Sequence, residues 1–368
     1  MKPKVTIEDI ARLAGVSKAT VSRVLNERSN VKAETRERVL RVMQEQGFVP
    51  SLAAAGLAGG RSRLVGVLTP PLTQPTVPEI LRGVAEAIEH TDYEIVLYST
   101  HAGQSPSTIV NRILALGLTS CLLVLQPGSL TPRLTQLATQ GLPVVVIDDQ
   151  GPAPELPSVG IDNRVSAYQA TMHLIRLGYR RIAHLQGPSE FRCVQERYQG
   201  YRQALDDAGY PFNPSLVFNG TFETSSGRAC ATALASLSPS ERPDAIFIAN
   251  DQMAYGFLGA AEALGLRIPQ DIAVVGFDDI PLSAHVKPRL TTVKQPFYEI
   301  GRNAVELLLS LLHAQPQQSV ADAESGPQPP IRIQLPTRLV IRESCGALLL
   351  PRHQEQEHTV SEEPKSEG

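Results

Sequence analysis

The chain has 368 residues, of which 42% are hydrophobic and 19% charged, with a formal net charge of −3. This length exceeds what one small core organises and predicts two or three globular domains. No apolar run reaches the roughly 18 residues that span a bilayer, and no apolar segment with a cleavage site opens the chain. We therefore expect a cytoplasmic protein with no membrane contact.

The charge is unevenly distributed along the chain. Residues 1–63 carry twelve Lys or Arg against six Asp or Glu, whereas the rest of the chain carries 22 against 31. A basic head on an acidic body indicates that a polyanion binds at the head. The same basic residues could instead solvate a helical surface, and charge alone does not decide between these alternatives.

The segment VTIEDIARLAGVSKATVSRVLN near the N-terminus predicts two short helices joined by a tight turn. Apolar residues recur at helical spacing in the first helix, which Thr6 is placed to cap and which Gly15 ends. Ser17 is placed to cap the second helix, whose apolar residues Val21 and Val24 face inward. Two short helices around a glycine turn are typical of a helix-turn-helix.

The second helix turns its polar residues outward, where its first residues would reach base edges in the major groove of DNA. Arg23 can donate two hydrogen bonds to guanine, and Ser22 can bond to a base or a phosphate. A helical bundle that contacts a protein is the alternative, but the polar outer face and the positive charge favour DNA. The residues expected to contact DNA are Thr6, Ser17, Lys18, Ala19, Thr20, Ser22, Arg23 and Asn26.

A third helix is predicted from Ala33 to Gln46 and completes an all-α head of residues 1–50. Lys32 precedes this helix and is a poor N-cap, so we expect fraying at that end. Residues 51–63, SLAAAGLAGGRSR, are rich in Ala and Gly and predict a hinge or linker.

From Leu64 onward, short apolar strands alternate with amphipathic helices, which predicts α/β lobes built on parallel sheets flanked by helices. Ligands bind outside the carboxyl ends of the strands in such sheets. The strands are expected at 64–68, 94–98, 121–125, 144–147, 181–185, 216–218, 245–248 and 273–277. The helices are expected near 79–90, 107–116, 132–139, 163–177, 195–208, 225–237, 252–264 and 297–313.

Two successive series of strands and helices predict a two-lobed core over residues 64–346. The lobes are expected to comprise about 64–161 with 292–330 (lobe 1) and 162–291 with 331–346 (lobe 2). A segment rich in Pro, Gln and Ser at 314–330 and the polar tail at 347–368 are predicted to be disordered.

The sequence contains none of the nucleotide-binding or catalytic motifs GxxxxGK, GxGxxG, GxSxG and HExxH. The histidines lack the spacing of metal ligands. The four cysteines are scattered, with no CxxC pair, and are expected to be reduced thiols: Cys121, Cys193, Cys230 and Cys345. We therefore expect neither an enzyme nor a metal site, and no cofactor other than a small-molecule effector.

Taken together, these segments resemble the lac-repressor/galactose-repressor (LacI/GalR) family of bacterial transcriptional regulators over residues 4–346. The family's head is matched by TIEDIARLAGVSKATVSRVLN, NVKAETRERV and GFVP, and its core by LGYRRIAHLQGP, ERYQGYRQAL, IFIANDQMAYG, IAVVGFDDIP and PRLTTVKQP, in the same order. The resemblance implies a helix-turn-helix head, a hinge and a core with the periplasmic-binding-protein fold. It also implies a homodimer on a pseudo-palindromic double-stranded DNA operator, because each recognition helix meets its own half-site.

In this family the hinge folds into a short helix on DNA, and a leucine wedges into the minor groove. Leu57 matches that leucine. Two other hinge positions depart from the family, since Ser51 and Ala55 stand where most members have Asn and Arg. Gly56 lowers helix stability by roughly 0.5–1 kcal/mol relative to Ala. Hinge folding is therefore expected to depend more on DNA or ligand than in other members.

The resemblance also implies an effector site, because polar and aromatic residues match positions that line the family's ligand cleft. Arg197 would donate to ligand hydroxyls, and Asp278 would accept from them. Asn250 would also bind the ligand; the alternative is that Asn250 or its neighbour Asp251 caps the next helix. The first loop of the core, PPLTQPTVPEI, lacks the family's aromatic pair. The residues expected to bind the effector are Asp148, Arg197, Phe222, Asn250, Asp278 and Phe297.

The sequence thus predicts a regulator whose DNA affinity a small ligand switches. Two carboxylates, an arginine, an amide and an aromatic ring suit a polyhydroxyl ring, so we expect a repressor of carbohydrate-use genes that a sugar releases. The segment IDDQGPAPELPSVGIDN resembles members that respond to plant-derived oligosaccharides. The alternatives are a regulator responsive to a purine or nucleoside, a ligand-blind DNA binder, and a sugar receptor that feeds a transporter.

Overall fold

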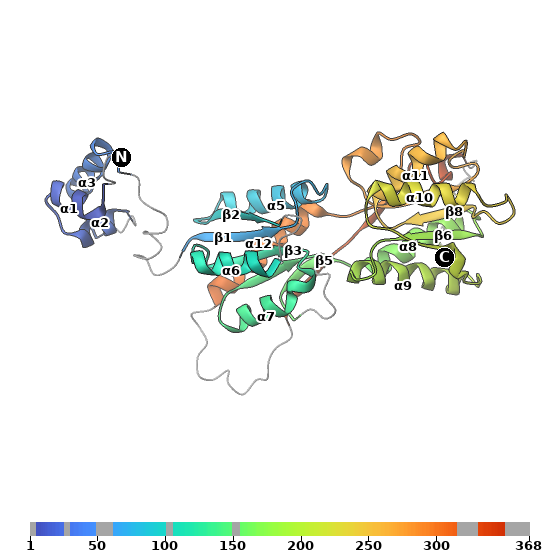
Figure 1. Cartoon of the computed structure of the whole chain (residues 1–368). Helices are drawn as coiled ribbons and strands as arrows, with labels where there is room; N and C mark the ends of the chain where they lie inside the picture. Colours follow the sequence, from blue (N-terminus) through green and yellow to red (C-terminus); the bar gives the residue numbers. More distant parts are fainter. Residues whose placement is uncertain are drawn as a thin grey trace, which may run out of the picture. The chain divides into compact units, whose positions relative to one another are not determined.

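The computed structural model describes residues 5–25, 30–48, 62–100, 106–148, 155–314 and 330–349. The chain divides into two compact units, which Figure 1 shows coloured along the sequence. The first unit comprises Met1–Asp162 and Pro296–Pro336, and the second comprises Asn163–Gln295 and Thr337–Gly368. Each lobe of the core therefore takes its residues from separate parts of the chain.

Three helices form the head: α1 (Ile7–Leu13), α2 (Lys18–Leu25) and α3 (Ala33–Glu45). Each helix contributes a fully buried side chain to one small core, namely Ile10, Val21 and Val39. The three predicted helices are confirmed.

Side-chain hydrogen bonds fix the ends of the first two helices. The Thr6 hydroxyl accepts from the Asp9 amide at 3.3 Å, and the Asp9 carboxylate accepts from the Thr6 amide at 3.0 Å, which together make a capping box. Gly15 has φ +66°, a conformation that costs glycine little, and it turns the chain between the helices. The Ser17 hydroxyl accepts from the Thr20 amide at 3.1 Å and caps α2. Lys32 makes no side-chain cap to α3.

The first lobe contains a six-stranded sheet in which every pair is parallel, with the order β11-β5-β4-β3-β1-β2. Its strands are β1 (Leu64–Thr69), β2 (Glu94–Ser99), β3 (Cys121–Leu125), β4 (Val144–Ile147), β5 (Ser158–Ile161) and β11 (Arg332–Leu335). Its helices are α5 (Val77–Glu89), α6 (Pro106–Leu116), α7 (Thr131–Thr139) and α12 (Phe297–Ala314).

Helices cover both faces of this first sheet. Leu122 and Val124 of β3 share a buried cluster with residues of α6 and α7. Because side chains alternate along a strand, the fully buried Leu123 points to the opposite face, where α12 packs on the strands beside α5. A Cβ atom on Gly83 of α5 would lie 2.0 Å from the carbonyl oxygen of Tyr298, so only glycine permits this close contact with α12.

The second lobe repeats the plan, with the strand order β12-β10-β9-β8-β6-β7. All of its pairs are parallel except β10 with β12. Its strands are β6 (Ile182–Gln186), β7 (Val217–Asn219), β8 (Ala245–Ile248), β9 (Ala273–Asp278), β10 (Thr291–Lys294) and β12 (Arg338–Val340). Its helices are α8 (Asn163–Arg176), α9 (Arg192–Asp207), α10 (Thr224–Ala235) and α11 (Asp251–Ala263).

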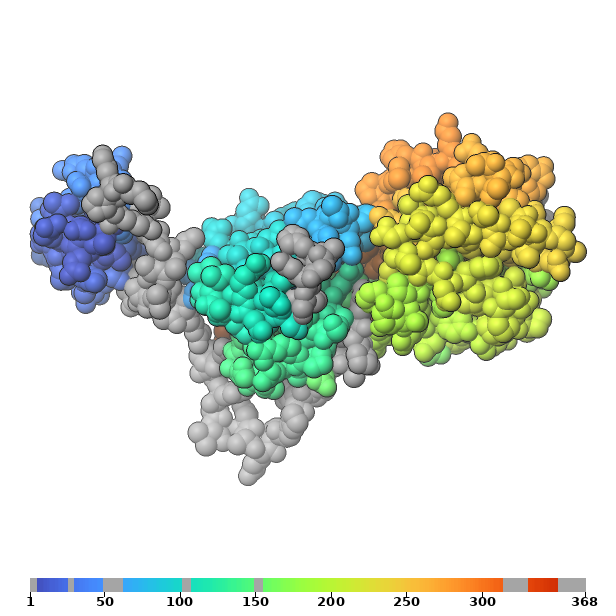
Figure 2. Space-filling view, in the orientation of Figure 1, coloured from blue at the N-terminus to red at the C-terminus, as the bar shows by residue number. Residues whose placement is uncertain are grey.

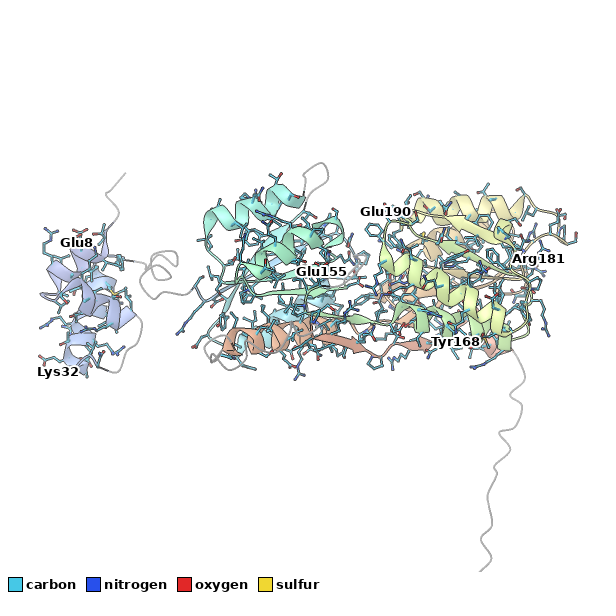
Figure 3. All side chains as sticks on the ribbon, turned by 90° about the horizontal axis from the view of Figure 1, so that it is seen from below. Glu8, Lys32, Glu155, Tyr168, Arg181 and Glu190 are labelled. Carbon is cyan, nitrogen blue, oxygen red and sulfur yellow. The ribbon has the colours of Figure 1, made fainter. Side chains whose placement is uncertain are left out.

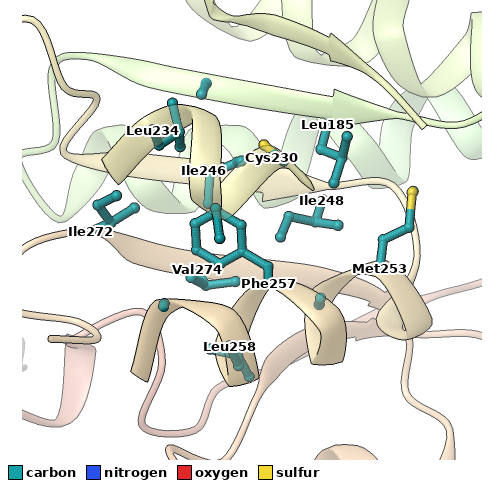
Figure 4. Close-up of a cluster of buried hydrophobic side chains, with 14 of the residues drawn as sticks. Leu185, Cys230, Leu234, Ile246, Ile248, Met253, Phe257, Leu258, Ile272 and Val274 are labelled. Carbon is teal, nitrogen blue, oxygen red and sulfur yellow. The ribbon is translucent and has the colours of Figure 1, made fainter. Parts of the chain in front are cut away.

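One core of the second lobe lies between its sheet and helices α10 and α11. Figure 4 shows Phe257 of α11 among Ile246, Ile248 and Val274 of the strands, all completely buried. Burying one such side chain contributes about 1.5–3 kcal/mol, so this cluster gives the lobe a rigid base. The space-filling view in Figure 2 shows the outer side chains of α10, in yellow, and α9, in green, on the visible face of this lobe.

The eight predicted strands and eight predicted core helices are confirmed to within a few residues. Four strands were not predicted, and two of them make the predicted lobe boundaries wrong. Residues 292–294 belong to β10, which pairs with β9 in the second sheet, although they were assigned to lobe 1. Residues 332–335 form β11, which pairs with β5 in the first sheet, although they were assigned to lobe 2.

Ala347–Leu349, at the start of the predicted disordered tail, form one 3₁₀ turn, so this part of the prediction is wrong. The rest of the tail lies outside the described residues, and so do the middle of the segment 314–330 and nearly all of the hinge at 51–63. Among the described residues, no helix combines the length and the apolar character needed to cross a membrane.

Candidate functional site

The head presents the predicted recognition helix with its polar side outward. Ser17, Lys18, Ala19 and Arg23 are exposed, while Thr20 and Ser22 are half-buried. The opposite side of α2 packs into the head's core. The predicted contact residues Asn26 and Leu57 lie outside the described residues.

Lys18 is held only loosely. Its ammonium group lies 3.7 Å from the carboxylate of Glu8 on α1, a residue labelled in Figure 3, and both side chains are largely exposed. Exposed pairs of this kind contribute about 0–1 kcal/mol, so a DNA phosphate can replace Glu8 as the partner. The Thr6 hydroxyl already donates a hydrogen bond to the Asp9 carboxylate at 2.7 Å, so any DNA contact from this hydroxyl competes with that bond.

In the second lobe, Arg197 of α9 is buried, with 4% of its surface exposed. Its Nε donates to the Asn163 side-chain oxygen at 2.9 Å, and its Nη1 donates to the carbonyl of Ala249 at 2.6 Å. The guanidinium also stacks on the ring of Phe277, 3.7 Å from the ring centre. This arrangement fixes the guanidinium in one orientation, which a surface residue would not have.

Asn250 follows β8 and caps α11. Its side-chain oxygen accepts from the amide of Met253 at 2.9 Å, and its side-chain nitrogen donates to the carbonyl of Phe222 at 3.1 Å. The amide group has four hydrogen-bonding positions in all, so one N–H and one lone pair stay available to a ligand. Asn250 therefore caps α11. The sequence alone had left this role open between Asn250 and Asp251.

Asp278 ends β9 in an unusual conformation, with φ +120°, and accepts from the side-chain nitrogen of Gln295 at 2.8 Å. The next residue, Asp279, has φ +56° and forms an ion pair with Arg342 at 2.7 Å. Positive φ values at two consecutive carboxylates mark backbone that the surrounding contacts must hold in place. Asp279 thus supports the turn, and Asp278 is the carboxylate placed at its tip.

Asp251 is completely buried and stabilises the same turn through hydrogen bonds. It accepts from the hydroxyls of Thr292 and Ser283, both at 2.6 Å, and from the amide of Ile280 at 3.2 Å. Burial, and after it the nearby carboxylate of Asp278, raise the pKa of Asp251 well above its usual range, although the three donors act in the opposite direction. Sequence reasoning did not identify this role.

Phe222 also has a positive φ, +67°, and its ring is only partly buried. The ring packs over Gly187, where a Cβ atom would lie 2.4 Å from it. A second aromatic ring, Phe191, lies 5.8 Å away between centroids, tilted by 35°. Phe191 was not among the predicted residues.

Four predicted effector residues are linked by these contacts. Arg197 bonds to the carbonyl next to Asn250, Asn250 bonds to the carbonyl of Phe222, and Arg197 stacks on the residue next to Asp278. They gather at the carboxyl ends of β8 and β9, the edge at which open α/β sheets bind ligands.

The other two predicted effector residues belong to the first lobe. Asp148 follows β4 with φ +53°, and its carboxylate accepts from the side chain of Gln126 at 3.2 Å. Gln126 follows β3 and also has a positive φ, +49°. A polar residue directly after the buried strand at 121–125 was the signal that could have identified it. Phe297 is the first residue of α12 and is half-buried.

In the described parts of the chain, no group of three or more His, Cys, Asp or Glu side chains could hold a metal ion. All four cysteines are buried and free of disulfides. The arrangement at the carboxyl ends of β8 and β9 offers a fixed donor, acceptors and an aromatic face, which are the groups of a binding site.

The fold and the sites define a helix-turn-helix DNA-binding domain joined to a two-lobed α/β ligand-binding core. Residues 6–51 match the family model "Bacterial regulatory proteins, lacI family", and residues 171–345 match "Periplasmic binding protein-like domain". The catabolite control protein A of Priestia megaterium is 33% identical, over 92% of this chain and 99% of that protein.

Two solved structures are similar in sequence and fold. The lac repressor dimer bound to operator and the anti-inducer ONPF is 30% identical, with a TM-score of 0.78, over 93% of this chain and 99% of that one. The transcriptional regulator CelR in complex with cellobiose is 33% identical, with a TM-score of 0.66, over 92% and 99%. This chain therefore belongs to the lacI family of bacterial regulatory proteins and is a DNA-binding transcriptional regulator.

Proposed function

We propose that this regulator is a repressor that binds a pseudo-palindromic operator as a homodimer and that a sugar releases. The observation that carries the proposal is the cluster of Arg197, Phe222, Asn250 and Asp278 at one edge of the second sheet. It acts by binding alone, without catalysis, and in the cytoplasm, where its operator DNA lies.

The chemistry of the cluster supports a polyhydroxyl ligand. Within the described part of the chain, hydrogen bonds occupy Nε and Nη1 of Arg197 and leave its Nη2 to donate to a ligand. Asp278 supplies acceptor oxygens, and the Phe222 ring covers the C–H face of a sugar ring. Arginine presents its donors as a rigid fork, which suits two neighbouring hydroxyls. Asp148 and Phe297, which belong to the first unit, remain predicted effector residues.

Cellobiose is the first sugar to test. The CelR structure that resembles this chain contains cellobiose, and the segment before Asn163 resembles members that respond to plant-derived oligosaccharides.

The head binds DNA through α2 in this proposal. Arg23 reads a guanine, Lys18 exchanges Glu8 for a phosphate, and the other contacts come from Thr6, Ser17, Ala19, Thr20, Ser22, Asn26 and the hinge residue Leu57. The dimer follows from the lac repressor, which resembles this chain and whose structure is a dimer on its operator.

A nucleoside is the second candidate effector. The two neighbouring rings of Phe191 and Phe222 offer a stacking surface for a flat base, and Arg197 with Asp278 could hold the ribose hydroxyls. Adenosine and cytidine are therefore the matched probes for this alternative.

Fluorescence anisotropy tests the proposal directly. A labelled duplex from the DNA just upstream of this protein's gene is titrated with the protein at fixed salt, against a random duplex, and with cellobiose, adenosine or cytidine added. We expect specific binding that cellobiose weakens by 10-fold or more, on the order of a 1–3 kcal/mol coupling. A shift with a nucleoside alone would replace the sugar, and tighter binding with cellobiose would make it a corepressor. No shift with any probe would support a ligand-blind regulator.

A further inference from the structure

Two of the chain crossings between the lobes connect directly to the proposed effector site. The second unit begins at Asn163 and its first segment ends at Gln295. The Asn163 side-chain oxygen accepts from Nε of Arg197 at 2.9 Å, and the Gln295 side-chain nitrogen donates to Asp278 at 2.8 Å. Each crossing residue thus holds one of the two charged groups expected to grip the effector.

These two amide side chains have little freedom. Asn163 and Gln295 are both 6% exposed, and the fold is destabilised when a buried polar group loses its hydrogen-bond partner. Asn163 also donates to Glu196 at 3.4 Å, and Glu196 is fixed in turn by an ion pair with Arg192 at 2.7 Å. A movement of Arg197 is therefore expected to displace Asn163, because the Asn163 side chain is held by hydrogen bonds and cannot rotate freely.

The link at Gln295 is double. Its backbone amide also donates to the carbonyl oxygen of Asp278 at 3.3 Å, beside the side-chain bond. Pro296 follows, and proline fixes its own φ and restricts the residue before it to extended conformations. A displacement of Asp278 therefore reaches the first residue of the other lobe through a stiff stretch of chain.

The third crossing has its hydrogen bond to a different residue and provides a control. The second unit resumes at Thr337, whose hydroxyl hydrogen-bonds to the hydroxyl of Ser166 at 2.8 Å. Ser166 lies within α8 and is not part of the proposed effector site. A side-chain hydrogen bond is thus present at all three crossings, but only those of Asn163 and Gln295 end on a proposed effector residue.

We propose that Asn163 and Gln295 are positioning residues that transmit effector binding at Arg197 and Asp278 to the two crossings between the lobes. This inference rests on the proposed function of the site as an effector site. Effector bound to the two charged groups shifts the crossings through these hydrogen bonds, one at Asn163 and two at Gln295.

The variants that test this are Gln295→Met and Asn163→Ala, with Thr337→Val as the matched control. Cellobiose affinity is measured by calorimetry, and operator affinity by anisotropy without and with saturating cellobiose. We expect the operator shift at saturating cellobiose to fall at least about 5-fold in both test variants, a substantial part of the coupling typical of such regulators, and the calorimetry sets the cellobiose concentration that saturates each variant. Thr337→Val should keep the full shift. A full shift in both test variants overturns the inference.

A second measurement needs no effector. Hydrogen–deuterium exchange is followed in the ligand-free full chain for peptides that cover residues 160–165, 291–298 and 337–342. Asp278→Ala should speed exchange at 291–298 and Arg197→Ala at 160–165, with 337–342 unchanged in both. Unchanged exchange at the first two peptides overturns the inference. If these rates rise but cellobiose leaves wild-type operator binding unaffected, the sugar proposal fails while the coupling of site to crossing stands.

Discussion

The guanidinium carbon of Arg197 lies 3.7 Å from the centre of the Phe277 ring. Phe277 directly precedes Asp278 in the sequence. The ring covers one face of the cation, and two hydrogen bonds fix its plane. A buried, planar and immobilised donor loses little conformational entropy when a ligand binds, which favours affinity.

Arg197→Lys should therefore lower cellobiose affinity by about 10- to 100-fold and leave operator affinity unchanged, because an ammonium cannot reproduce the fork of donors. The matched control is Arg202→Lys on the same helix, where the guanidinium stacks 3.8 Å from the Phe212 ring but bonds to no effector residue. Calorimetric titration of both variants measures the effect. Equal affinity in the two variants would show that Arg197 only braces the lobe.

Asn250→Ser separates two roles of one side chain. Serine is a good N-cap, so the free energy of unfolding should stay within about 1 kcal/mol of wild type, whereas the amide contact to the effector is lost. We expect cellobiose to bind about 10-fold more weakly. Asn250→Ala, which also removes the cap to Met253, should lose about 1 kcal/mol more stability. Wild-type cellobiose affinity in the serine variant would leave Asn250 with the cap alone.

Strands with long apolar runs were predictable from the sequence, whereas the four strands that were missed each contain polar residues. The buried strand at Cys121–Leu125 is wholly apolar and was located to the residue. Strand β11 has only four residues, two of them exposed, so its pattern resembles that of a loop. Its assignment to the first sheet depends on pairing with Ser158–Ile161, more than 150 positions earlier in the sequence, which no local pattern encodes.

The candidate site divides in the same way. Arg197, Asn250 and Asp278 sit in motifs that could be matched locally. Asn163 and Gln295 act through hydrogen bonds to residues 34 and 17 positions away, which form only when the lobe has folded. An asparagine at a helix start and a glutamine before a proline have ordinary local explanations, so no local pattern singles them out.

Arg23→Ala should weaken binding to the operator by about 1–3 kcal/mol, or roughly 10- to 100-fold, and binding to random DNA much less, because a contact to guanine carries sequence information. Arg41→Ala, at an exposed position on α3, removes the same charge away from the recognition helix. That control should weaken both kinds of DNA equally if it weakens either. Competition anisotropy at fixed salt measures the ratio, and an unchanged ratio in Arg23→Ala would contradict base reading.

The buried histidine of the second lobe should make its stability dependent on pH. His184 is completely buried, with ring centroids of Tyr201 and Phe247 each 5.0 Å away, and burial lowers its pKa from 6.5 to about 4. One ring nitrogen, Nδ1, lies 2.9 Å from the carbonyl oxygen of Phe247, while Nε2 has no partner among the described residues. A proton on Nε2 would therefore create a buried charge with no acceptor.

The sign follows from linkage. Because the unfolded chain takes up this proton near pH 6.5 and the folded chain only near pH 4, stability is full above pH 6.5 and falls as the pH drops towards 4, by about 3 kcal/mol at most. Urea unfolding followed by circular dichroism at pH 7 and pH 4.5 measures the loss. His184→Gln cannot titrate in this range and should show a smaller loss, whereas His285→Gln, at an exposed position, should match wild type. An equal loss in His184→Gln and wild type would place the acid sensitivity elsewhere in the lobe.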